Sequence, residues 1–155
     1  MRIHDYRDLI VWQKSVELSE LAYRLVKAFP PHERYGLSSQ ITRAAISVAS
    51  NVAEGNAFPR RSHYIYYVDL ARGSLYELAT QLEIATRLTY VTRADASTAF
   101  SLIDSISRML LRLRTRLRTS APSPATGPFP RSPGAKPASP RAPSAPASLT
   151  PNTAP

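Results

Sequence analysis

The sequence contains no cysteine, which excludes disulfides, thiolate zinc sites and cysteine nucleophiles. It also lacks an apolar run of the roughly 20 residues that a membrane-spanning helix needs. The first residues do not form the apolar segment of a signal peptide. Together these absences predict a cytoplasmic protein without a membrane segment.

Motifs for catalysis and metal binding are missing as well. The three histidines, His4, His32 and His63, fall in terminal or connecting segments, and no Glu-x-x-His pair of the kind that binds metals inside helical bundles is present. No glycine-rich phosphate loop, nucleophile elbow or Ser/His/Asp arrangement occurs. We therefore expect no catalysis, cofactor or metal. General acid-base chemistry would recruit Glu54, Asp69 and Glu77, and for Glu54 and Glu77 a structural role is expected instead.

Composition divides the chain into two parts. Residues 1–118 carry 17 Lys and Arg and all 11 Asp and Glu, a net charge of +6. Residues 119–155 add three basic residues, no acid and 11 of the 14 prolines. Because proline breaks helices and the rest is mostly Ala, Ser and Thr, this second part cannot build a core. We predict a domain over 1–118 followed by a disordered, basic tail over 119–155.

Apolar residues recur at helical spacing in four segments of the first part, over about 5–29, 37–54, 63–88 and the region up to 118. Asp5 or Asp8 can cap the first segment, and Ser62 can cap the third. Gly55 is expected to end the second, while Thr92 and Asp95 have the spacing of a capping box before the fourth. Short connections predict an all-α fold, an antiparallel up-down-up-down four-helix bundle with a disordered Pro/Ala/Ser-rich C-terminal tail.

The second and third segments are expected to pack face to face. Gly73 lies inside a strongly helical stretch, which predicts close approach of another backbone. Arg43, Ser47 and Asn51 form a polar row at four-residue steps beside the apolar face. Antiparallel pairing predicts an ion pair between Arg43 and Glu77 inside a partly buried polar network. The predicted network comprises Arg43, Ser47, Asn51, Glu54, Ser74, Glu77 and Gln81.

The same segments carry a family resemblance. The stretches Arg-Ala-Ala-Ile-Ser at 43–47 and Asn-Val-Ala-Glu-Gly at 51–55, followed by Gly-Ser-Leu at 73–75 and Glu-Leu at 77–78, resemble the bacterial four helix bundle protein family. That family includes proteins encoded by intervening sequences in large-subunit rRNA genes and is related to the accessory variability protein of diversity-generating retroelements. The resemblance implies a helical bundle that forms a homopentamer, associates with nucleic acid, has no assigned catalysis and acts as accessory to a partner such as a reverse transcriptase.

An up-down-up-down bundle brings the chain start, the second connection and the end of the fourth helix to one pole. Only Asp5, Asp8 and Glu54 are expected as acids there, so the pole attracts phosphates. The alternative is a solvated arginine face that suits the negative end of the fourth helix. The predicted nucleic-acid-binding residues are Arg2, Arg7, Arg60, Arg61, Arg108, Arg112, Arg114, Arg116 and Arg118.

Two further alternatives concern aromatic residues and partners. Tyr64, Tyr66 and Tyr67 can stack on unpaired bases beside the arginines, although tyrosines packed in a bundle or subunit interface are commoner. Trp12, within an apolar stripe, is interpreted as core. No base-reading module is recognised, so the main hypothesis is binding of RNA, or else DNA, through phosphates and shape. The competing hypothesis is a protein-only scaffold whose arginines keep it in solution.

Overall fold

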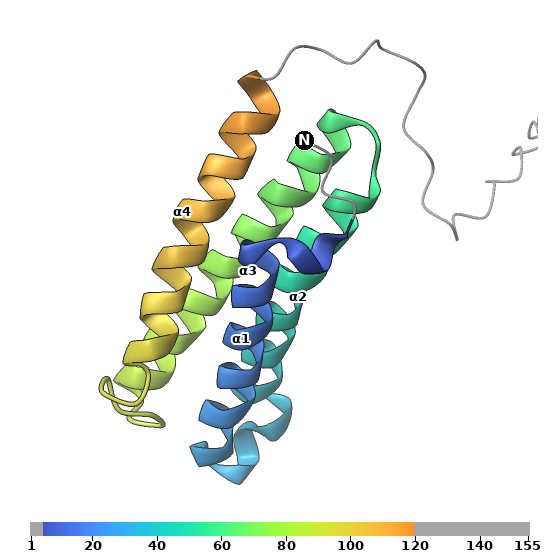
Figure 1. Cartoon of the computed structure of the whole chain (residues 1–155). Helices are drawn as coiled ribbons and strands as arrows, with labels where there is room; N and C mark the ends of the chain where they lie inside the picture. Colours follow the sequence, from blue (N-terminus) through green and yellow to red (C-terminus); the bar gives the residue numbers. More distant parts are fainter. Residues whose placement is uncertain (1–4, 120–155) are drawn as a thin grey trace, which may run out of the picture. The chain divides into compact units, whose positions relative to one another are not determined.

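The computed structural model describes residues 5–119, which form four α-helices joined by short 3-10 helices and turns. Figure 1 shows the helices running alternately up and down the bundle, with the α2–α3 turn and the end of α4 at the same end. The predicted all-α, up-down-up-down fold is therefore confirmed. The elements are η1 (Tyr6–Asp8), α1 (Ile10–Leu25), η2 (Val26–Ala28), η3 (Pro31–Tyr35), α2 (Leu37–Ala57), α3 (Arg61–Arg87) and α4 (Ser97–Thr119).

Each helix packs against two neighbours: α2 lies between α1 and α3, and α4 contacts α3 and α1. The shared interior is aliphatic, and each fully buried Leu or Ile stabilises it by about 1.5–3 kcal/mol. Trp12 is only partly buried, but its ring packs against this core and meets Tyr6 edge-on at 5.1 Å, so its interpretation as a packing residue is confirmed. The largest fully buried side chains are Leu18, Ile41, Leu75, Leu78, Leu82, Ile106 and Leu110.

The first helix starts later than predicted. Asp5 caps the short η1, where its carboxylate accepts from the Arg7 amide at 2.9 Å, and it does not cap α1. The N-cap of α1 is Leu9, which has no side-chain capping bond. Leu9 is itself buried, so packing against the core fixes the start of α1 where a polar cap was expected. The prediction of a first helix capped by Asp5 or Asp8 was wrong.

The end of α2 was also predicted wrongly, because Gly55 lies inside the helix and the helix continues to Ala57. Gly55 is buried, and a Cβ built on it would lie 2.7 Å from Cδ2 of Tyr64 and 3.0 Å from Cβ of Tyr67. Glycine at this position therefore permits α3 to approach α2 closely. The glycine that was predicted to end the helix is instead required for helix packing.

Gly73 shows the reverse error. No atom lies within 4 Å of a Cβ built on Gly73, so this glycine is not explained by close approach within the chain. Ser62, predicted as the cap of the third helix, lies within the first turn of α3, whose N-cap is Arg60 without a side-chain bond. Despite these two corrections, the predicted helix over about 63–88 agrees with α3, which ends at Arg87, one residue before the predicted end.

The capping box before α4 is half formed. The Thr92 hydroxyl accepts from the Asp95 amide at 3.1 Å, but it donates to the Asp95 carboxylate at 2.6 Å. In a complete box the carboxylate would accept from the Thr92 amide, and aspartate is too short to favour that geometry. A turn separates this pair from the first residue of α4, Ser97.

The predicted tail, 119–155, lies outside the described residues except for Thr119, and the domain boundary at residue 118 stays a prediction. Within residues 5–119, none of the helices is both long and apolar enough to cross a membrane.

The two helical glycines form a matched pair for a stability test. Gly55→Ala should lower the free energy of unfolding by about 1–2 kcal/mol, because the new methyl group overlaps Tyr64 and overpacking outweighs the gain in helix propensity. Gly73→Ala should raise it by about 0.5–1 kcal/mol, because its methyl group meets open space. Urea unfolding at one fixed protein concentration measures both. Equal stabilisation by the two substitutions would contradict the assigned role of Gly55.

Candidate nucleic-acid interface

The outer face of α4 carries a row of arginines. The helix buries Ala99, Leu102, Ile103, Ile106 and Leu110 on one side. Arg108, Arg112 and Arg116 follow at four-residue steps and are exposed, as is Arg118. No acid follows Asp104 in α4, so the last turns present positive charge alone. We call Arg108, Arg112, Arg116 and Arg118 the α4 ridge.

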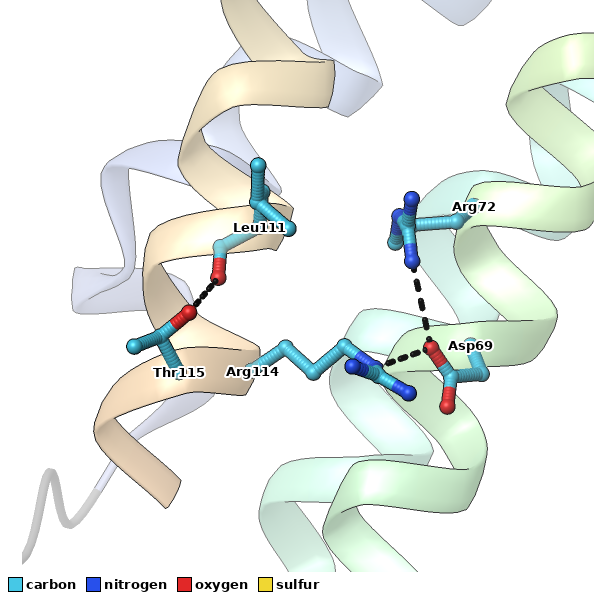
Figure 2. Close-up of polar contacts among 5 residues, drawn as sticks. All are labelled: Asp69, Arg72, Leu111, Arg114 and Thr115. Carbon is cyan, nitrogen blue, oxygen red and sulfur yellow. Dashed lines mark hydrogen bonds and ion pairs between the residues drawn. The ribbon is translucent and has the colours of Figure 1, made fainter. Parts of the chain in front are cut away.

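Arg114, another predicted nucleic-acid-binding residue, does not belong to this ridge. Its Nε donates to Oδ1 of Asp69 on α3 at 2.7 Å, and its side chain is only 25% exposed. Arg72 donates to the same oxygen at 3.5 Å, as Figure 2 shows. Two guanidinium groups thus share one carboxylate across the α3–α4 interface. Arg114 holds the two helices together, and a phosphate would have to displace Asp69 to reach it.

The ion-paired cluster extends to Tyr76. Hydrogen bonds from Arg72 and from the Ser107 hydroxyl lower the pKa of Tyr76, because both stabilise the phenolate form. Nε of Arg72 is buried without a hydrogen-bond partner among the described residues. Asp69 therefore contacts the Arg72 guanidinium only through Nη1. With two arginines and one carboxylate, the group of Asp69, Arg72 and Arg114 keeps a net charge of +1.

The remaining predicted arginines differ in how far they are available. Arg60 and Arg61 are half-buried and engage in interactions within the fold. Arg7 pairs with Asp5 at 3.3 Å and lies over the Tyr6 ring at 4.9 Å, and η1 sits lower than the α2–α3 turn in Figure 1. Arg2 lies outside the described residues. Among residues 5–119, none of the ion pairs involves Arg108, Arg112 or Arg118, whereas Arg116 takes part in an interaction. Arg108, Arg112 and Arg118 are therefore the predicted residues best placed for an external anion.

The tyrosines beside the α2–α3 turn mostly pack within the fold. Tyr64 is half-buried against Gly55, and burial raises its pKa. Tyr67 stacks on Phe58 with ring centroids 5.2 Å apart. Desolvation, followed by the negative charge of Glu54 and a hydrogen bond to it, raises the pKa of Tyr67. Tyr66 alone of the three is largely exposed, so two of the three rings offer no stacking platform for bases.

The polar network between α2 and α3 forms in part. The Ser47 and Ser74 hydroxyls are 2.9 Å apart, and Nδ2 of Asn51 donates to the Ser47 carbonyl at 2.8 Å and to its hydroxyl at 3.0 Å. These contacts bring together Ser47, Asn51 and Ser74, three members of the predicted network. Only the Ser47–Ser74 contact crosses from α2 to α3, whereas the Asn51 bonds stay within α2.

The other predicted members of the network lie elsewhere. Arg43 and Glu77 are both exposed, and their ion pair is absent from those of the described residues, so that prediction was wrong. Glu77 accepts instead from Nε2 of Gln81 at 2.9 Å, along α3. Glu54 hydrogen-bonds Tyr67. The prediction assumed that Arg43 and Glu77 lie at the same level along the bundle. Both side chains are exposed to solvent and are not part of the α2–α3 interface.

Sequence reasoning missed the ion-pairing role of Asp69 and Arg72, because it considered Asp69 only as a possible acid-base group and did not compare its level with that of Arg114. The signal was present: Asp69 lies two turns into α3 and Arg114 about one turn before the end of α4. Antiparallel helices bring such positions to the same level. Within residues 5–119, no group of three or more His, Asp or Glu side chains could hold a metal ion. His63, one of the conceivable ligands, is buried edge-on against Phe58.

The shared carboxylate predicts a stability effect. Asp69→Asn should lower the free energy of unfolding by about 1 kcal/mol, the upper end for a partly exposed pair, because two guanidinium groups lose their counter-charge at once. Glu83→Gln is the control, since Glu83 is equally exposed and also pairs with two arginines, Arg87 and Arg93, but none of these lies between α3 and α4. Chemical denaturation at low and high salt measures both. An Asp69→Asn protein as stable as the parent would contradict the helix-joining role.

Comparisons with known proteins agree with this architecture. A protein of unknown function from the S23 ribosomal protein family of Bacteroides thetaiotaomicron has a similar crystal structure, with a TM-score of 0.62 and 22% identity, covering 68% of this chain and 98% of that one. At that identity the likeness concerns the fold alone. No curated protein matches the sequence. The family model described as 23S rRNA-intervening sequence protein matches residues 7–112, well over half of the 155 residues. The chain therefore belongs to the 23S rRNA-intervening sequence protein family.

Proposed function

We propose that this protein binds nucleic acid, RNA in preference to DNA, through phosphate contacts of the α4 ridge. The observation that carries the proposal is the run of exposed arginines on α4 beyond the last acid, Asp104. Arginine pairs with phosphate in bidentate fashion, and a one-sign surface attracts polyanions at long range. The preference for RNA rests on the family, whose description refers to a ribosomal RNA. No base-reading module accompanies the ridge, so sequence preference should be weak.

A homopentamer would multiply this surface. Pentamer formation is expected from the family resemblance, and an exposed stripe on α3 is suited to contact between subunits. Tyr66, Leu70, Ile84 and Leu88 follow one helical face, interrupted by the exposed Glu77, and expose 40–57% of their surface. Five ridges on one particle would bind a long polyanion far more tightly than one.

The cellular part of the proposal is an accessory role. By the resemblance to the accessory variability protein of diversity-generating retroelements, the protein would act in the cytoplasm beside a partner such as a reverse transcriptase and perform no catalysis itself. A protein-only scaffold is the alternative, favoured by the exposed apolar stripe on α3 and not by the ridge. A reverse transcriptase gene beside this one, and co-purification of the two proteins, would support the accessory role.

Charge reversal tests nucleic-acid binding. Reversing Arg112, Arg116 and Arg118 to Glu should abolish binding of a structured RNA and release co-purifying nucleic acid, while the oligomer persists. For the parent, the logarithm of the binding constant should fall with the logarithm of salt concentration at a slope of about −4, as expected for about five neutralised phosphates. Filter binding across a salt series measures both quantities.

The matched control carries the same change of net charge elsewhere, with Arg24, Arg43 and Arg87 reversed, all three being exposed on α1, α2 and α3. Asp69→Asn is a second control, because removing that carboxylate should leave binding equal or stronger. Equal loss in both triple variants, or binding that does not respond to salt, would rule out the ridge as the interface and favour the scaffold.

The oligomer has its own test. Leu70→Glu should dissociate the assembly, because it buries a charge in the proposed contact stripe, while the helical content of the subunit stays unchanged. Sedimentation velocity measures the change. Leu111→Glu, at an exposed leucine on α4, is the control and should leave the assembly intact. A parent protein that sediments as a monomer at all concentrations would refute the pentamer.

A further inference from the structure

A second candidate site lies at the end of the bundle away from the α2–α3 turn. The end of α1, the connecting segment with η3, and the start of α2 enclose an open hollow of about 460 Å³. This volume falls within the usual range for small-molecule sites and suits one nucleotide-sized ligand. We call it the Tyr23–Tyr35 hollow. Its lining residues are Tyr23, Val26, Lys27, Phe29, Pro30, Pro31, Arg34, Tyr35, Ser38, Ser39 and Thr42.

The charges around the hollow have one sign. Lys27 and Arg34 are both exposed, and the lining includes no acid. The adjacent acid, Glu33, is directed into the fold: Oε2 accepts from the Leu37 amide at 2.8 Å, and Oε1 accepts from the Tyr90 hydroxyl at 3.2 Å. Glu33 therefore caps the start of α2 and does not neutralise the two cations. The hollow favours an anionic ligand.

Three aromatic residues, Tyr23, Phe29 and Tyr35, belong to the same lining. Phe29 is buried and packs on Tyr90, whereas Tyr23 exposes 50% and Tyr35 exposes 86% of its surface. Core packing does not explain a tyrosine as exposed as Tyr35. Arg34 lies over that ring, 5.7 Å from its centroid, so ring and cation are presented together. This combination suits a planar aromatic group attached to an anion.

We propose that the Tyr23–Tyr35 hollow binds an unpaired nucleotide, with the base stacked on the exposed tyrosine rings and the phosphate paired with Lys27 and Arg34. The Ser38 and Ser39 hydroxyls enter none of the hydrogen bonds among the described residues, so both remain able to bond base edges or sugar. A peptide with acidic and aromatic side chains is the competing ligand. The compact lining, drawn from residues 23–42, fits one nucleotide better than an extended chain. The inference goes beyond the α4 ridge, which lies at the other end of the bundle.

Amide chemical shifts of the full-length, ¹⁵N-labelled protein test the proposal, with adenosine 5′-monophosphate as the probe. Saturable shifts are expected in residues 27–42. Adenosine and ribose 5-phosphate should each bind at least about tenfold more weakly, because one lacks the anion and the other the stacking ring. Tyr35→Ala and Lys27→Glu should each weaken nucleotide binding by about tenfold, within the range for removing one stacked ring or one phosphate contact.

Two control variants distinguish the hollow from the α4 ridge and from exposed tyrosines in general. Tyr66→Ala removes another exposed tyrosine and Arg112→Glu removes a ridge arginine, and both should bind the nucleotide as the parent does. Circular dichroism verifies that every variant is folded. Absence of saturable shifts up to about 10 mM nucleotide would overturn the proposal. So would equal binding of ribose 5-phosphate, or saturable binding of an acidic aromatic peptide but not of the nucleotide. Loss of nucleotide binding in Arg112→Glu but not in Tyr35→Ala would assign the binding to the ridge instead.

Discussion

The close packing of α2 on α3 is the constraint on which the rest of the structure depends. Gly55 leaves room for the ring of Tyr64 and the Cβ of Tyr67, and the Ser47 and Ser74 hydroxyls meet across the same interface. Small residues permit close approach, and the hydrogen-bonded serines fix the relative level of the two helices. The register between α2 and α3 determines the level along the bundle of every other side chain on α3. A shift of one turn would move both its core face and its charged residues relative to α4.

That register has an electrostatic consequence. It brings Asp69 on α3 to the level of Arg114 on α4, so a cation that the sequence suggested for ligand binding serves the fold. The ridge residues Arg108, Arg112 and Arg116 lie on another face of α4, and Arg118, one turn beyond Arg114, is exposed near the helix end; no carboxylate follows Asp104 on this helix. The ion-paired Arg114 and the exposed Arg112 and Arg116 thus differ by only two positions on one helix. An α-helix turns by about 100° per residue, so two residues correspond to about 200°. One side chain can therefore lie in the interface while the other lies in water.

The Tyr23–Tyr35 hollow depends on a different feature, the path of the chain between α1 and α2. The prolines at 30 and 31 prevent continuation of α1, and Glu33 then closes the connection by accepting from the first amide of α2. Because Glu33 is held by these internal bonds, Lys27 and Arg34 face the opening without a neighbouring counter-charge. A connection that looks like a simple linker in the sequence shapes a concave surface.

Local patterning alone determined the four helices, their order and the aliphatic core, because the apolar spacing of residues such as Ile41, Val48, Leu75 and Leu82 specifies which face is buried whatever the neighbour. Tertiary structure alone decided the roles of the two glycines. The sequence alone does not distinguish a glycine that ends a helix from one that lets a neighbouring helix approach, because the difference depends on the position of that neighbour. For this reason Gly55 and Gly73 were each assigned wrongly. Tertiary structure likewise decided that Arg114 pairs with Asp69 and that Arg43 and Glu77 do not pair. Contacts between helices depend on the rotation of each helix and on its level along the bundle. Residue spacing within one helix specifies neither of these.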